Sequence, residues 1–110
     1  MKRVLLDHCV PKAVRSFLTG FDVVTAYQAG WSDLASGALL AKVEESGFDL
    51  FVTADQNLRY QQNLAGRKVA ILLLPTNTLN ELRPLSNEIA EVSGRANPGD
   101  FLIVGKRTNS

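Results

Sequence analysis

Residues 50–55, Leu-Phe-Val-Thr-Ala-Asp, decide the fold class of this chain. The uninterrupted run of apolar and β-branched side chains from Leu50 to Thr53 is typical of a strand buried on both faces. Similar short runs stand at residues 4–6, 23–25, 68–74 and 101–104. Because segments with helical periodicity separate several of these runs, the pattern predicts an α/β domain with a mostly parallel central sheet of about five short strands.

Two helical segments lie between the first three runs. The first begins at Pro11, which suits the opening turn of a helix, and ends at Gly20, where glycine favours the left-handed conformation. The second spans about residues 34–46, with Asp33 or Ser36 as its N-cap and a glycine after its end. Helices are therefore expected between consecutive strands, as parallel pairing requires.

A third helical segment spans residues 76–93 and contains Pro84. Since proline cannot donate a hydrogen bond to the preceding turn, Pro84 is expected to kink or split this helix. The last few residues, about 106–110, are expected to fray. At 110 residues and 12.0 kDa the chain has the size of one domain, so we interpret residues 1–110 as a single domain.

The composition excludes several classes of protein. Apolar residues make up 45% and charged residues 21% of the chain, a balance typical of globular proteins. No run approaches the roughly 18 apolar residues of a membrane span, and no leader pattern precedes the first strand. One cysteine, Cys9, excludes an internal disulfide. We therefore expect a cytoplasmic protein without membrane association.

Two of the predicted strands end in a carboxylate, the first at Asp7 and the third at Asp55. The carboxyl ends of parallel strands share one edge of the sheet, where α/β folds bind ligands. Two nearby carboxylates repel each other, so a site that keeps both ionised generally holds a cation, and oxygen ligands suit Mg²⁺ or Mn²⁺. The same residues also fit a structural interpretation, in which Asp7 caps a helix and Asp55 belongs to a turn.

The segment Val-Thr-Ala-Asp-Gln-Asn-Leu at residues 52–58 carries a family resemblance. Together with the strand that ends at Asp7, the proline-started helix and the Gly30-Trp31 loop, it resembles the small PIN-like proteins identified as predicted nucleases of toxin–antitoxin systems, which are similar to VapC toxins. The resemblance covers nearly the whole chain and implies a three-layer α/β/α fold. It also implies a metal-dependent ribonuclease with a small antitoxin-like protein partner, and homodimers are common among such proteins.

The resemblance implies a divalent-metal site of three or four acids. Asp7 and Asp55 occupy its first and last acidic positions and would be the catalytic residues, holding Mg²⁺ or Mn²⁺ for the hydrolysis of RNA phosphodiesters. His8 stands where a further acid is usual, and Ser36 stands at the acidic position of the second helix. Asp33 is the nearest carboxylate to that position and is a candidate third ligand.

Other residues are candidates for supporting this site. His8 could bind metal or carry a proton, but alternation along an extended segment would turn it away from Asp7, which favours a structural or helix-cap role. Thr53 and Asn57 are candidates for orienting Asp55, or for turn formation. Candidate contacts to RNA phosphates are the cations Lys12, Arg15, Arg59, Arg67 and Lys68.

Other functions fit the sequence less well. Residues 9–16 have the Cys-x5-Arg-Ser spacing of small tyrosine phosphatases, but Pro11 removes a backbone donor and no Asp-Pro pair supplies a general acid. The glycine-rich motifs of dinucleotide and P-loop sites do not occur. Trp31 and Tyr60 are more typical of packing than of base stacking. The main alternative is a catalytically inactive PIN-like module that binds RNA or a partner protein, because the acidic set is incomplete.

Overall fold

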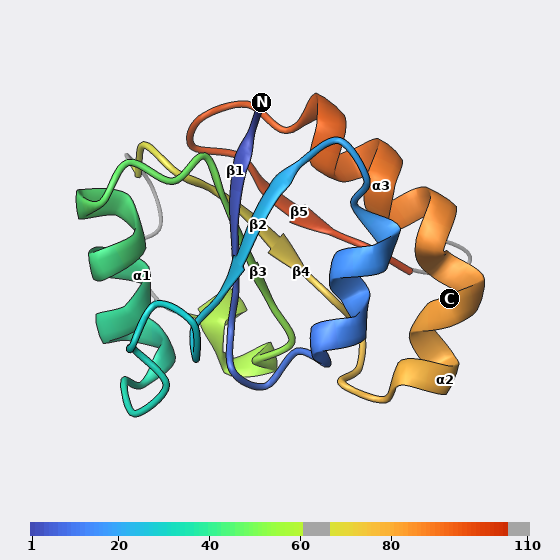
Figure 1. Ribbon diagram of the computed structural model, residues 1–110, viewed down its shortest axis with the longest axis horizontal. Helices are drawn as coiled ribbons and strands as arrows, with labels where there is room; N and C mark the ends of the chain where they lie inside the picture. Colours follow the sequence, from blue (N-terminus) through green and yellow to red (C-terminus); the bar gives the residue numbers. More distant parts are fainter. Residues whose placement is uncertain (61–66, 106–110) are drawn as a thin grey trace.

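The computed structural model describes residues 1–60 and 67–105, and the backbone alone at residues 36, 59 and 60. In this part of the chain five strands form one sheet in the order β2-β1-β3-β4-β5, and every pairing is parallel. The predicted α/β class with a parallel sheet of about five short strands is confirmed (Figure 1). The strands are β1 (Arg3–Leu6), β2 (Asp22–Thr25), β3 (Leu50–Thr53), β4 (Ala70–Leu73) and β5 (Phe101–Ile103).

Helices cover both faces of the sheet and give three layers (Figure 1). One face is covered by η1 (Lys12–Phe17), α2 (Leu79–Leu82), η4 (Arg83–Leu85) and α3 (Ser86–Arg95). The other face is covered by α1 (Ser36–Glu45) and η2 (Gln56–Tyr60). None of the described helices has the length and apolar character needed to cross a membrane.

The strands are largely apolar because each contributes side chains to two cores. In β1, Val4 and Leu6 join the core under η1, α2 and α3, whereas Leu5 joins the core under α1. In β3, Val52 and Phe51 divide in the same way. Successive side chains of a strand point to opposite faces, so burial on both faces produces a continuous apolar run instead of an alternating one.

Several predicted turns and breaks are confirmed. Gly20 and Gly47 have φ values of +87° and +83°, the left-handed conformation expected after the first two helical segments. The first of these segments is a 3-10 helix of six residues. Pro84 splits the third segment, because the 3-10 turn η4 contains it and separates α2 from α3. The tail predicted to fray, residues 106–110, lies outside the described residues.

The N-cap predicted for the second helical segment is wrong. The N-cap residue of α1 is Ala35, and its side chain makes no capping hydrogen bond. Asp33 stands two residues before this position, too early to receive the amide groups of the first turn, and Ser36 is already the first helical residue. Burial of the apolar face of α1, which includes Leu39, stabilises this helix in place of a cap.

The connection from β4 to β5 places α2 and α3 behind η1. This connection covers the same face of the sheet as η1, which connects β1 to β2. The β1–β2 and β4–β5 connections run in opposite directions across the sheet, so they have opposite hand. The β4–β5 connection is the one that departs from the usual right-handed crossover. As a result Val14 of η1 lies in one core cluster with Leu82 and Ile89. A 3-10 helix of this length needs such support, because it has few hydrogen bonds of its own.

Candidate functional site

The acidic strand ends lie where the chain changes direction across the sheet. From β1 the chain proceeds to β2 on one side, while β3 pairs with β1 on the other side. In doubly wound sheets this switch point is where ligands bind, outside the carboxyl ends of the strands. Asp7 directly follows β1 and Asp55 follows β3 by two residues, so both belong to this edge.

Asp7 is a buried carboxylate with a hydrogen-bond donor at each of its two oxygens. Its residue is 1% exposed, and its backbone N–H continues the β1–β3 ladder by donating to Val52 O at 2.9 Å. The Thr53 hydroxyl donates to Asp7 Oδ2 at 2.7 Å, and the His8 backbone N–H donates to Asp7 Oδ1 at 2.7 Å. Burial of a carboxylate requires such partners, and these two bonds also fix its orientation.

Thr53 connects the two acidic strand ends. Its Oγ1 donates to Asp7 Oδ2 and accepts from the backbone N–H of Asp55 at 3.1 Å. The Asp55 carboxylate is half-buried, and its Oδ1 accepts the backbone N–H of Asn57 at 3.0 Å. Thr53 was a candidate for orienting Asp55; its hydroxyl contacts the backbone of Asp55 and the carboxylate of Asp7. Asn57 contacts Asp55 through its backbone, not through its side chain amide.

His8 does not turn away from Asp7, so that prediction is wrong. Its Nε2 lies 3.6 Å from Asp7 Oδ1, and its side chain is 43% exposed. The prediction assumed extended backbone, but Val10 N–H donates to Asp7 O at 2.9 Å and closes a turn at residues 7–10. In a turn the alternation of a strand no longer applies, and consecutive side chains can share one side.

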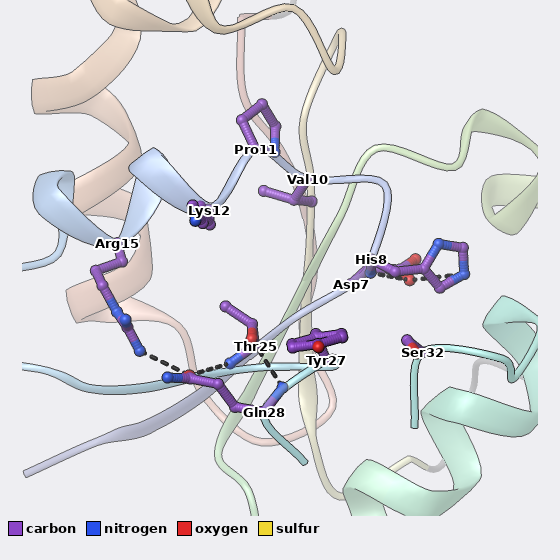
Figure 2. A pocket seen from close by; sticks show the side chains of 10 residues that line it. All are labelled: Asp7, His8, Val10, Pro11, Lys12, Arg15, Thr25, Tyr27, Gln28 and Ser32. Atoms are coloured by element: carbon purple, nitrogen blue, oxygen red, sulfur yellow. Dashed lines mark hydrogen bonds and ion pairs between the residues drawn. The ribbon is translucent and has the colours of Figure 1, made fainter. Parts of the chain in front are cut away.

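A pocket of about 720 Å³ opens beside Asp7, a volume typical of small-molecule sites (Figure 2). It lies between the end of β1, the helix η1, and the end of β2 with the turn that follows. Asp55 does not line it. The residues that line it are Asp7, His8, Val10, Pro11, Lys12, Arg15, Thr25, Tyr27, Gln28 and Ser32.

Two predicted RNA contacts, Lys12 and Arg15, lie on η1 at this pocket. Both are exposed, and Lys12 makes no hydrogen bond or ion pair with any residue that the structure describes. Arg15 Nη2 donates to Val23 O at 2.9 Å and to Gln28 Oε1 at 2.8 Å. The guanidinium group is therefore held in place, with its Nε and Nη1 hydrogens left for a ligand.

Tyr27 and Gln28 are pocket residues that the sequence analysis missed. They occupy the turn after β2, which Gln28 stabilises by accepting the Thr25 backbone N–H at Oε1 and donating its own backbone N–H to Thr25 Oγ1, both at 3.0 Å. The available signal was their position directly after a strand, at the edge where Asp7 lies. Ligands of α/β folds bind at this edge, so an aromatic and an amide residue there are candidate ligand contacts as much as the carboxylates are.

The remaining candidates do not gather at Asp7. Asp33 is exposed. Among the described residues, no three His, Cys, Asp or Glu side chains form a metal-binding group, and this includes Asp7, Asp33 and Asp55. Arg67 and Lys68 precede β4 and so lie at the opposite, amino edge of the sheet. The candidate side chains of Ser36 and Arg59 lie outside the described residues.

The donor chemistry at Asp7 is compatible with a divalent cation. A carboxylate offers about four lone-pair positions, so Asp7 can accept from Thr53 and His8 and still bind an ion. Mg²⁺ commonly keeps several waters and takes one or two carboxylates together with substrate phosphate oxygens. Asp7 could serve as one such carboxylate, and Asp55, at the same edge of the sheet, as a second.

Cys9 lacks the environment of a phosphatase nucleophile. Burial raises the pKa of its thiol above the ordinary value, and the nearby Asp7 carboxylate acts in the same direction. A reactive thiolate needs a lowered pKa in an electropositive site. The Cys9 side chain packs against the core instead, with Sγ 3.9 Å from Thr53 Oγ1.

Compared with protein-family models, with curated proteins and with solved structures, the chain matches none. The resemblance to small PIN-like nucleases therefore stands on the quoted residues alone.

Proposed function

We propose that the protein is a Mg²⁺- or Mn²⁺-dependent ribonuclease that hydrolyses RNA phosphodiesters at the carboxyl ends of β1 and β3. The observation that carries the proposal is the buried Asp7 carboxylate at a pocket whose wall bears Lys12 and Arg15. Hydrolysis of a phosphodiester needs both signs of charge, a carboxylate for a metal ion and cations for the phosphate. The family resemblance points to the same chemistry.

The residues of the chain have distinct tasks in this proposal. Asp7 and Asp55 would hold the ion, which when bound neutralises phosphate charge and makes a water a better nucleophile. Thr53 fixes the Asp7 carboxylate by its hydroxyl and thereby acts as a positioning residue. Lys12 and Arg15 would bind the phosphate oxygens and thereby fix the position of the RNA strand in the site. Both stand on η1, which packs with α2 and α3 in one core cluster.

The biological setting is proposed from the resemblance. We infer a cytoplasmic toxin–antitoxin component whose substrate is RNA, with a small antitoxin-like protein and a second copy of the chain as partners. The net charge of +1 gives little long-range attraction to RNA, so binding would depend on the local cations of the pocket.

The proposal is tested by incubating purified protein with assorted RNAs, with and without Mn²⁺. We expect metal-dependent cleavage that Asp7→Asn and Asp55→Asn each reduce at least about 100-fold, the range typical of essential electrostatic groups. Asp22→Asn is the matched control, because Asp22 is exposed and lies at the start of β2, on the other edge. Cleavage that survives both site variants would reveal a contaminating enzyme or another site.

A second candidate is a PIN-like module that binds RNA or a partner protein without catalysis. The observation in its favour is that no three His, Cys, Asp or Glu residues of the described chain form a metal-binding group. Calorimetric titration with Mn²⁺ separates the two functions, with Asp7→Asn as control. The binding module would be favoured if the protein binds RNA but millimolar Mn²⁺ produces no heat, whether or not RNA is present.

A further inference from the structure

We propose that the pocket beside Asp7 is a mononucleotide subsite, in which Tyr27 stacks on a base while Lys12 and Arg15 bind its phosphate. This inference rests on the proposed function and deepens it, because it names the part of an RNA chain that the pocket takes. Three observations support it: an exposed ring at the pocket mouth, an amide donor beside the ring, and an excess of cations on the wall.

The first observation is the exposure of Tyr27. Its residue is 80% exposed although its backbone is well ordered by hydrogen bonds, among them Gly30 N–H to Tyr27 O at 3.1 Å and Trp31 N–H to Ala26 O at 2.9 Å. Trp31, by contrast, packs edge-on against Phe48 at a centroid distance of 6.2 Å. Tyr27 thus offers an exposed aromatic face that the core does not use, on a turn held by backbone hydrogen bonds, and base stacking requires such a face.

The second observation is the orientation of Gln28. Its Oε1 accepts from two unambiguous donors, the Arg15 guanidinium and the Thr25 backbone N–H, so this atom is the oxygen and the other is the NH₂ group. That NH₂ group makes no hydrogen bond with any described residue. Figure 2 shows Gln28 beside Tyr27 in the pocket lining. All four bases carry acceptors, so an amide donor there adds affinity without selecting one base.

The third observation is the charge of the wall. Lys12 and Arg15 are exposed, whereas the single carboxylate of the lining, Asp7, is 1% exposed. A phosphate can contact the two cations while the base lies on Tyr27. A nucleotide therefore meets the ring, the amide and the cations together, whereas an acidic peptide would meet only the cations.

Binding of small probes without added metal tests the subsite. Adenosine 5′-monophosphate and ribose 5-phosphate share the phosphate and the sugar and differ in the base. We expect the nucleotide to bind about 5- to 150-fold tighter, the range equivalent to base–aromatic stacking. Tyr27→Ala should abolish this ratio while leaving ribose 5-phosphate binding unchanged, and Tyr27→Phe should retain it. Lys12→Gln should weaken both ligands and leave the ratio intact.

A spectroscopic readout excludes an indirect effect of the substitutions. Stacking on Tyr27 should shift the adenine H8 and H2 proton resonances upfield, and Tyr27→Ala should remove the shift. Equal binding of the two probes, binding of neither, or a ratio that survives Tyr27→Ala would overturn the subsite. So would binding of an acidic peptide, but of no nucleotide, at Tyr27.

Failure of the subsite and failure of the ribonuclease give different results. Nucleotide binding that depends on Tyr27, without metal-dependent RNA cleavage, would leave the subsite standing and end the hydrolase proposal. RNA cleavage that depends on Asp7 but is unaffected by Tyr27→Ala, with equal binding of the two probes, would do the reverse.

Discussion

Thr53 joins the ends of β1 and β3 through one hydroxyl group. The group donates to a buried carboxylate oxygen of Asp7 and accepts the backbone N–H of Asp55. Thr53 itself is completely buried, so water cannot replace either bond. The local geometry of the proposed metal site therefore depends on a side chain that would not touch the metal.

Replacement of Thr53 by valine tests this dependence. Thr53→Val keeps the shape of the side chain but removes the hydroxyl and with it the 2.7 Å hydrogen bond to Asp7 Oδ2. We expect a loss of about 1–3 kcal/mol in the free energy of unfolding, measured by urea denaturation. Thr53→Ser, which keeps the hydroxyl, should recover part of the loss. If Thr53→Val and the wild type were equally stable, the hydrogen bond would make no net contribution to the free energy of unfolding.

The residues of the site were only partly predictable. Asp7 and Asp55 could be found because an acid directly after an apolar run marks the end of a strand. The link through Thr53 depends on the β1–β3 register, which follows from the sheet and not from spacing along the chain. His8 was misplaced because the chain turns at residues 7–10, closed by the hydrogen bond from Val10 N–H to Asp7 O, where an extended segment was assumed. Tyr27 was missed because a single aromatic residue gives no periodic signal.

At the scale of elements, apolar runs and helix breakers were the reliable signals. β3 begins and ends where the sequence predicts, and Pro84 divides the third helical segment as expected. Both signals are local, since burial on two faces and the missing N–H of proline act on the residues themselves. The cap of α1 was wrong because packing of its apolar face, a tertiary effect, decides where that helix begins.

Glu44 of α1 ties this helix to the chain entering β4. Its carboxylate accepts the backbone N–H of Lys68 and pairs with Arg67 Nη1 at 2.9 Å. The hydrogen bond from the Lys68 N–H, with a further contribution from Arg67, holds the pKa of Glu44 below its ordinary value of 4.5. A carboxyl with a lowered folded-state pKa stabilises the protein above the unfolded-state pKa, and the contribution is lost as pH falls through the folded-state value.

Glu44→Gln should therefore destabilise the protein in a pH-dependent way. We expect a loss of about 1 kcal/mol at neutral pH, because the pair is partly exposed. The difference between wild type and variant should narrow as the pH falls below 4.5. Urea denaturation at several pH values measures this difference. Glu45→Gln is the control, since its pair with Lys42 spans 3.9 Å on an exposed surface; a difference that stays constant with pH would contradict the assignment.

At the scale of the whole molecule, the order of the strands was beyond the reach of the sequence. Order depends on which face each connection covers, and that is settled by long-range packing. The β4–β5 connection illustrates the point, because it covers the face of η1 against the usual hand of such crossovers. Because this connection places α2 and α3 against η1, it also supports the helix that carries Lys12 and Arg15.

Lys2 connects the amino-terminal segment of the chain to the end of α3 by hydrogen bonds. Lys2 Nζ donates to the carbonyl oxygens of Ser93, Gly94 and Ala96 at 2.9, 3.2 and 2.8 Å. An ammonium group at a helix C-terminus satisfies carbonyls that lack helical partners and opposes the negative end of the helix dipole.

Lys2→Met should lower the free energy of unfolding by about 1–2 kcal/mol, because it keeps the aliphatic stem but removes the charge and its three hydrogen bonds. Urea denaturation measures the loss, and amide hydrogen exchange should show faster opening at the end of α3. Lys42→Met, on the exposed face of α1, should change stability by less than about 0.5 kcal/mol. Equal effects of the two substitutions would show that the contacts of Lys2 are not stabilising.

The pocket lining falls entirely between Asp7 and Ser32, a contiguous fraction of the chain. Side chains such as Tyr27, Gln28 and Ser32 stand on a turn that follows the edge strand β2, outside the strand pairing. Gln28 also holds this turn through its hydrogen bonds to Thr25, whereas the side chains of Tyr27 and Ser32 are exposed. A library randomised at residues 27 and 32, with Gln28 retained, could therefore be selected for new ligands with little risk to the scaffold.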